Sequence, residues 1–282
     1  MPGHHVGRRL QLSLPIMAPN TTEHGDSSPA GDKSEIRSVA DLVERLQKVA
    51  IPTTELWFRG HGAESWDLQP SVYRSFEHAK NESAMLARFR QEAAAAGQPF
   101  AFDQWGWVIY AQHHGIPTRL LDWSLSPLVA LYFASLSEKL KNGEDSGEDG
   151  TFYILRPTDL NKEAGASDEG HPRLLNEADN VLIDYLPGRA NSNPSKPRAV
   201  IGPMLFDRVR FQHGTFTVGQ PRVDGTIELE RSSSIESFTV PHESKVEILD
   251  ELRVLQFNEV SIFKDVDRVA SRISREYGRK PL

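Results

Sequence analysis

The spacing of apolar and polar residues predicts helices and strands that do not alternate regularly along the chain. A helical period predicts helices at 38–49, 82–96, 103–113, 126–140, 245–255 and 267–277. Apolar runs and alternation predict strands at 55–58, 151–155, 209–218, 238–240 and 259–263. Polar stretches at 158–180 and 219–237 are expected to be loops. Irregular alternation of this kind is typical of a single α+β domain.

The chain before residue 38 lacks such periodicity and is rich in Pro, Gly, Ser, Asn, Thr and His. A segment of this composition cannot bury enough apolar surface to offset the loss of chain entropy on folding. We therefore expect a disordered leader over residues 1–37 and one folded domain over residues 38–282.

Charge and composition exclude several classes of protein. The net charge of −7 argues against a chain that mainly coats nucleic acid or an acidic membrane. The absence of cysteine rules out disulfides, thiol nucleophiles and Cys-based zinc sites, and fits a reducing compartment. No stretch is long and apolar enough to span a bilayer. We expect a cytoplasmic protein with no membrane partner; its oligomeric state stays open.

The densest group of chemically capable side chains is the run from Gln112 to Ser124, which reads QHHGIPTRLLDWS. Its polar density and its Gly-x-Pro break predict a loop, and Ser126-Pro127 then begins an apolar helix. Such a loop forms either a surface site or a fully hydrogen-bonded buried network.

Individual residues of this run each have a chemical and a structural interpretation. His113 or His114 could act as a general base, or could cap a helix and face solvent. The two histidines lack a third ligand at a familiar spacing, so we expect no metal. Arg119 and Asp122 could contact a ligand or simply pair with each other. Trp123 could stack on a planar ring or fill the core.

Two further polar residues of interest lie outside this run. Arg59 follows the apolar strand 55–58 and precedes Gly60, which suits a guanidinium that clamps a phosphate, or else forms a structural ion pair. Gln212 interrupts the apolar strand 209–218, which suggests either an approaching ligand or an ordinary bulge.

Four blocks of sequence together resemble the FRG domain, which is named for its Phe-Arg-Gly motif. The blocks are residues 57–60 with 68–74 (WFRG and LQPSVYR), 112–134, 210–217 (RFQHGTFT) and 257–267 (FNEVSIFKDVD). The last block departs from the family pattern, because Lys264 stands where a proline is usual. The resemblance covers residues 42–273 and implies an FRG domain over residues 38–282.

The order of these blocks is also similar to that of mono-ADP-ribosyltransferases. In those enzymes an Arg holds NAD, a Ser/Thr turn shapes the nicotinamide pocket, and a Glu on a later strand binds the ribose. The analogy implies a central mixed or antiparallel split sheet flanked by helices. It gives Arg59 the first role and residues 118–124 the second. Gln212 takes the third position without the negative charge, which Asp122, Glu228 or Glu230 would then supply.

The resemblance and the analogy together imply an NAD-consuming, ADP-ribosyltransferase-like enzyme or NAD glycohydrolase, in the setting of a toxin or antiphage effector. The expected catalytic residues are Arg59, Asp122 and Gln212. The expected contacts to NAD are Arg59, Gly60, His113, His114, Thr118, Arg119, Trp123 and Ser124. Two alternatives stay open: a non-catalytic nucleotide-binding sensor module, and a purely structural motif. The acceptor of any ADP-ribose is also open.

Overall fold

The fold is defined by a computed structural model that describes most of the chain from residue 35 onward. The described residues are 35–49, 55–95, 102–137, 140, 143–166, 168–189, 196–203, 215–219 and 228–263. All of them belong to one compact unit, Ser34–Leu282. Its first described residues are already part of the fold, because Glu35 forms a β-bridge to Thr239 and Ile36 is fully buried. Residues 1–34 of the predicted leader lie outside the described residues.

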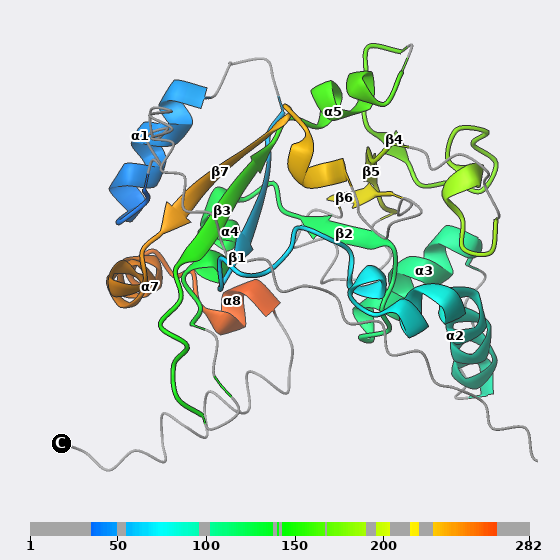
Figure 1. The fold of residues 1–282 in the computed structure, drawn as a ribbon, viewed down its shortest axis with the longest axis horizontal. Coiled ribbons are helices and arrows are strands. Elements are labelled where there is room, and N and C mark those ends of the chain that lie inside the picture. Colours follow the sequence, from blue (N-terminus) through cyan, green and yellow to red (C-terminus); the bar gives the residue numbers. More distant parts are fainter. Residues whose placement is uncertain are drawn as a thin grey trace, which may run out of the picture. The chain divides into compact units, whose positions relative to one another are not determined.

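Two separate sheets form the centre of the fold, as Figure 1 shows. One is antiparallel, with the order β1 (Trp57–His61), β3 (Gly150–Leu155) and β7 (Ile235–Val240). The other has the order β2 (Leu120–Trp123), β6 (Thr215–Val218), β5 (Arg198–Ile201) and β4 (Arg173–Leu174), and is mixed because β4 runs parallel to β5. Phe58 and Ser124 exchange two backbone hydrogen bonds of 2.8 Å, which join β1 to the end of β2. The predicted α+β class and split sheet are confirmed.

Helices surround the two sheets. They are α1 (Val39–Val49), α2 (Phe76–Ala95), α3 (Gln104–His113), α4 (Pro127–Ala134), α5 (Pro157–Glu163), α7 (Lys245–Val254) and α8 (Glu259–Phe263). Short 3-10 turns cover Ser71–Arg74, Ile183–Tyr185, Glu228–Arg231 and His242–Ser244. The predicted helices at 103–113 and 126–140 begin with N-caps, since Asp103 accepts a hydrogen bond from the Gly106 amide and Ser126 from the Val129 amide. None of the helices in the described residues has the length and apolar character to cross a membrane.

Several segments differ in type from the prediction. Residues 120–123 form strand β2 and not a loop, because Leu120 and Leu121 are buried and pair with β6. Residues 157–163 form α5 within a predicted loop, with Pro157 at its start. Residues 259–263 form α8 and not a strand. Asn258 and Ser261 cap that helix reciprocally, as each side chain accepts a hydrogen bond from the other residue's amide.

Boundaries also differ from the prediction. β1 continues to His61, α2 begins at Phe76, α4 ends at Ala134, and β7 begins at Ile235. The predicted helix 267–277 and the first part of the predicted strand 209–218 lie outside the described residues.

Helix α4 packs directly onto the backbone of β1 and β3. A Cβ atom at Gly60 would overlap the carbonyl oxygen of Ala130, and one at Gly150 would overlap that of Ala134. Only glycine therefore permits this close approach of helix and sheet. Gly60 lies within β1, paired with Phe152, so the strand continues past the predicted end at residue 58. Its position next to α4 fixes where Arg59 and His61 stand relative to that helix.

Candidate functional site

A cavity of about 280 Å³ lies where β1, the end of β2 and the start of α4 meet. Five of the predicted site residues line it: Arg59, Gly60, Asp122, Trp123 and Ser124. Five polar or aromatic residues that the sequence did not single out as site residues also line it: Phe58, His61, Trp66, Arg74 and Phe133. The cavity therefore combines two guanidinium groups, one carboxylate and several aromatic rings.

Arg59 is half-buried within β1, opposite Tyr153 of β3. Its Nη1 atom donates to the backbone oxygen of Asp122 at 2.6 Å, and its Nε atom donates to Nε2 of His61 at 2.9 Å. No described residue accepts a hydrogen bond from Nη2 at this position. Burial lowers the pKa of Arg59 to about 10, and the charge of Asp122 partly offsets this. The group stays cationic at neutral pH and keeps donors for an anion.

His61 holds the Arg59 guanidinium in place. The imidazole is buried, and its Nδ1 atom lies 3.2 Å from the backbone oxygen of Trp66. A proton on Nδ1 satisfies that carbonyl and leaves Nε2 as the acceptor for Arg59. Burial, reinforced by the charges of Arg59 and Arg74, lowers the pKa of His61 to about 3. The ring is therefore neutral at physiological pH.

Asp122 is exposed on β2, and its carboxylate is oriented by a short polar chain. Its Oδ2 atom accepts a hydrogen bond of 2.7 Å from the amide of Gln112. The amide oxygen of Gln112 in turn accepts a hydrogen bond from the hydroxyl of Thr118. Thr118 is fully buried and lies behind Asp122, outside the cavity lining. Its place in the structure is thus to support the carboxylate, and not to contact a ligand directly.

Arg119 lies in a buried ion pair and not at the cavity. Its Nε atom lies 3.0 Å from both carboxylate oxygens of Glu82 on α2, and Nη1 donates to the backbone oxygen of Tyr185 at 2.7 Å. The interpretation in which Arg119 pairs with Asp122 is wrong. Because Glu82 lies 37 positions earlier in the chain, the spacing of Arg119 and Asp122 could not reveal this partner.

The remaining predicted residues fall into three groups. Neither His113 nor His114 lines the cavity, and the His114 ring lies edge-on to Tyr110, 4.6 Å between ring centres. Trp123 is almost completely buried and its indole donates to the Thr217 hydroxyl at 3.1 Å, so it forms a fixed wall. Gln212 lies outside the described residues, as do the side chains of Glu228 and Glu230. Within the described part of the chain, no three His, Asp or Glu side chains gather as a metal site.

Arg74 and Trp66 are the functional candidates that sequence reasoning missed. Arg74 ends the 3-10 turn Ser71–Arg74 and lies close enough to lower the pKa values of both Arg59 and His61. It belongs to the LQPSVYR block, so its signal was present in the sequence. A separation of fifteen residues from Arg59 gave no reason to place the two guanidinium groups at one cavity.

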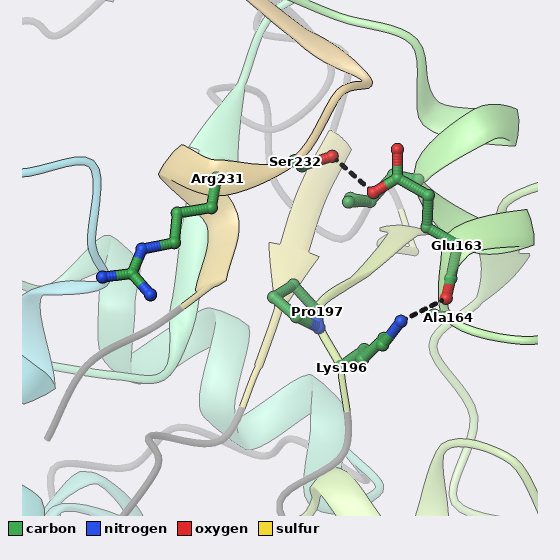
Figure 2. A pocket seen from close by; sticks show the side chains of 7 residues that line it. Glu163, Ala164, Lys196, Pro197, Arg231 and Ser232 are labelled. Carbon is green, nitrogen blue, oxygen red and sulfur yellow. Dashed lines mark hydrogen bonds between the residues drawn. The ribbon is translucent and has the colours of Figure 1, made fainter. Parts of the chain in front are cut away.

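A second cavity, of about 180 Å³, lies between α5, β5 and the turn Glu228–Arg231 (Figure 2). Its central carboxylate, Glu163, accepts hydrogen bonds of 2.6 to 2.8 Å from all three hydroxyls of residues 232–234. Burial alone would raise the pKa of Glu163, but these hydroxyls and Lys196 hold it below its usual value. Lys196 also donates to the Glu163 backbone oxygen at 3.1 Å. The Glu163 carboxylate is thus satisfied by groups of the protein itself, which favours a structural role for it.

Comparison with known families agrees with the position of the first cavity. Residues 54–143 match the family model of the FRG domain. The resemblance to the FRG domain is confirmed over this segment of the chain. Every residue that lines the first cavity, from Phe58 to Phe133, lies within the matched part of the FRG domain. Separate searches of curated proteins and of solved structures found no match.

Proposed function

We propose that the FRG domain of this chain binds NAD in the cavity lined by Arg59 and Asp122 and breaks its nicotinamide–ribose bond. The observation that carries this proposal is the meeting of two guanidinium groups, a carboxylate and aromatic rings at one cavity. Guanidinium groups suit a pyrophosphate, and aromatic faces suit a planar base. The activity would be that of an ADP-ribosyltransferase-like enzyme or an NAD glycohydrolase.

In the proposed reaction, the bond between the ribose C1′ atom and the nicotinamide nitrogen breaks, and its electron pair leaves with neutral nicotinamide. The positive charge that develops on the ribose is stabilised by the carboxylate of Asp122. An acceptor oxygen or nitrogen then forms a bond to C1′ and loses a proton. With water as the acceptor, the products are ADP-ribose, nicotinamide and one proton.

The hydrogen bonds around Asp122 support this role. The amide of Gln112 donates a hydrogen bond to the carboxylate, which fixes its direction. Arg59 contacts the backbone oxygen of Asp122 and not its side chain, so its charge is available to a phosphate. Gln212 remains proposed as the residue that orients a ribose hydroxyl.

The direct test is release of nicotinamide from NAD by the purified full chain. Asp122→Asn should lower the rate by about 100-fold or more, because it removes the stabilising charge and keeps the shape. Asp250→Asn, on the exposed side of α7, is the matched control and should leave the rate unchanged. No release by the wild-type chain, or an equally active Asp122→Asn protein, would contradict the proposal.

A non-catalytic nucleotide-binding module is the second candidate. It is favoured by the fact that Asp122 supplies the one carboxylate among the described residues lining the cavity, and this group already accepts a hydrogen bond from Gln112. Saturable NAD binding without nicotinamide release would support this candidate. The same assay therefore separates the two functions.

We also propose a biological role for this activity, as a toxin or antiphage effector. A cytoplasmic enzyme that consumes NAD would stop growth, which fits a toxin or antiphage effector. Expression of the wild-type chain in bacterial cells should lower cellular NAD, whereas Asp122→Asn should not. The chemical nature of the acceptor would follow from analysis of ADP-ribosylated products.

A further inference from the structure

Trp66 is a large aromatic side chain that is exposed at the edge of the functional cavity. It lines that cavity, yet 41% of its surface is open to solvent. The other tryptophans of the chain are buried, with exposed fractions of 7% or less. Exposure of an indole beside a cavity with two cations points to a ligand that covers it.

The backbone around Trp66 is fixed on both sides. The neighbouring residues Ala63 and Leu68 are buried in the fold. The Trp66 carbonyl oxygen is held by Nδ1 of His61 at 3.2 Å, and the Ser65 amide donates to the Glu148 carboxylate. The indole therefore stands at the cavity edge on a supported segment, which lowers the entropy cost of ligand contact.

The chemistry beside Trp66 indicates which ligand would cover it. Arg74 lines the same cavity, and within the described part of the chain its guanidinium donates a hydrogen bond to the Gln69 backbone oxygen alone, at 3.5 Å. A planar ring next to a phosphate group matches an indole next to a guanidinium. A sugar phosphate without a base would contact Arg74 and leave Trp66 uncovered.

We propose that Trp66 stacks on the heteroaromatic ring of the bound nucleotide while Arg74 contacts its phosphate. The inference rests on the proposed nucleotide ligand and adds that a mononucleotide suffices for recognition. The ring, and not the phosphate alone, then determines affinity. A cavity of about 280 Å³ suits a ligand of roughly this size.

Calorimetry with nicotinamide mononucleotide, AMP and ribose 5-phosphate tests this assignment on the full chain. Trp66→Ala should weaken binding of at least one of the two mononucleotides by about 5- to 150-fold, the range for loss of one base stack. Binding of ribose 5-phosphate should change by less than about twofold. Trp66→Phe keeps an aromatic face and should restore most of the affinity.

Phe76→Ala is the matched control, because Phe76 is an exposed aromatic residue outside the cavity lining. It should leave all three affinities unchanged. Mononucleotide binding to Trp66→Ala within about twofold of wild type would overturn the proposal. So would a wild-type chain that binds neither mononucleotide at millimolar concentration.

The two proposals fail in different ways. Ring-dependent binding without nicotinamide release would contradict the proposed NAD cleavage and support the stacking role of Trp66. Nicotinamide release by Trp66→Ala with an unchanged KM would support the proposed cleavage and contradict the stacking role of Trp66. Quenching of tryptophan fluorescence by AMP, present in wild type and reduced in Trp66→Phe, gives an independent reading.

Discussion

Arg59 and Arg119 have the same side chain and were both expected to contact NAD, but the fold uses them differently. Arg119 is buried and paired with Glu82 from α2, so its charge is neutralised inside the protein. Arg59 is held by a neutral histidine and a backbone oxygen, and lines a cavity. An arginine thus becomes a candidate ligand contact when no carboxylate from elsewhere in the fold reaches its guanidinium.

The largest effect is expected from breaking the buried pair. Arg119→Ala leaves the Glu82 carboxylate buried without its cation, which should cost about 3 to 5 kcal/mol of unfolding free energy. Denaturant unfolding measures this loss. Arg88→Ala, which breaks an exposed pair with Glu92, is the control and should change stability by less than about 1 kcal/mol. Equal losses in both variants would contradict the buried role of Arg119.

A similar loss is expected one residue from Arg59, for a steric reason. Gly60→Ala places a Cβ atom against the Ala130 carbonyl, so α4 must move away from β1. Overpacking of this kind should cost about 3 kcal/mol, measured by thermal or denaturant unfolding. A Gly60→Ala protein as stable as wild type would show that α4 does not pack on this strand as closely as described.

Lowering the pH should destabilise the fold through His61, the residue that holds Arg59. The folded state has a His61 pKa of about 3, below the unfolded value of about 6.5, so it binds fewer protons. This contribution to stability is complete above pH 6.5 and is lost as the pH falls toward 3, by up to about 1.4 kcal/mol per pH unit. Unfolding at pH 7 and pH 5 should show a smaller acid loss in His61→Gln. Parallel losses would exclude a buried neutral histidine.

Removal of the Arg59 side chain should have a small effect on stability and a large effect on binding. Arg59→Ala should change the unfolding free energy by about 1 kcal/mol or less, because its guanidinium makes no ion pair with a carboxylate among the described residues. NAD binding, measured by calorimetry, should be lost. A destabilisation equal to that of Arg119→Ala would remove the distinction between the two arginines.

The smallest change in stability is expected for Asp122→Asn. Asp122 is exposed and does not pair with Arg119, and asparagine retains an oxygen that accepts the Gln112 hydrogen bond. The unfolding free energy should stay within about 0.5 kcal/mol of wild type. A loss of about 3 kcal/mol in denaturant unfolding would indicate a buried charge at this position after all.

Local signals in the sequence were sufficient for much of the fold. The caps at Asp103 and Ser126 and the apolar period of α1 and α7 predicted real helices. Errors arose where a short polar run hid a strand, as in β2, or where a cap was overlooked, as with Asn258 and Ser261 before α8. Pairing with β6 makes residues 120–123 a strand, and one reciprocal pair of hydrogen bonds between Asn258 and Ser261 starts α8.

The sequence by itself determined the α+β class, the FRG motif and the presence of Arg59, Asp122, Trp123 and Ser124 at a common site. The first two inferences depend on local propensity and on residues adjacent in the chain, whereas the pairing of Arg59 with Asp122, 63 positions apart, came from the family resemblance. Only the tertiary structure decided that Glu82 neutralises Arg119, that Thr118 supports Asp122 from behind, and that Arg74 and Trp66 join the cavity. Those outcomes depend on which distant segments come together, because burial and charge pairing are set by spatial neighbours that spacing along the chain does not encode.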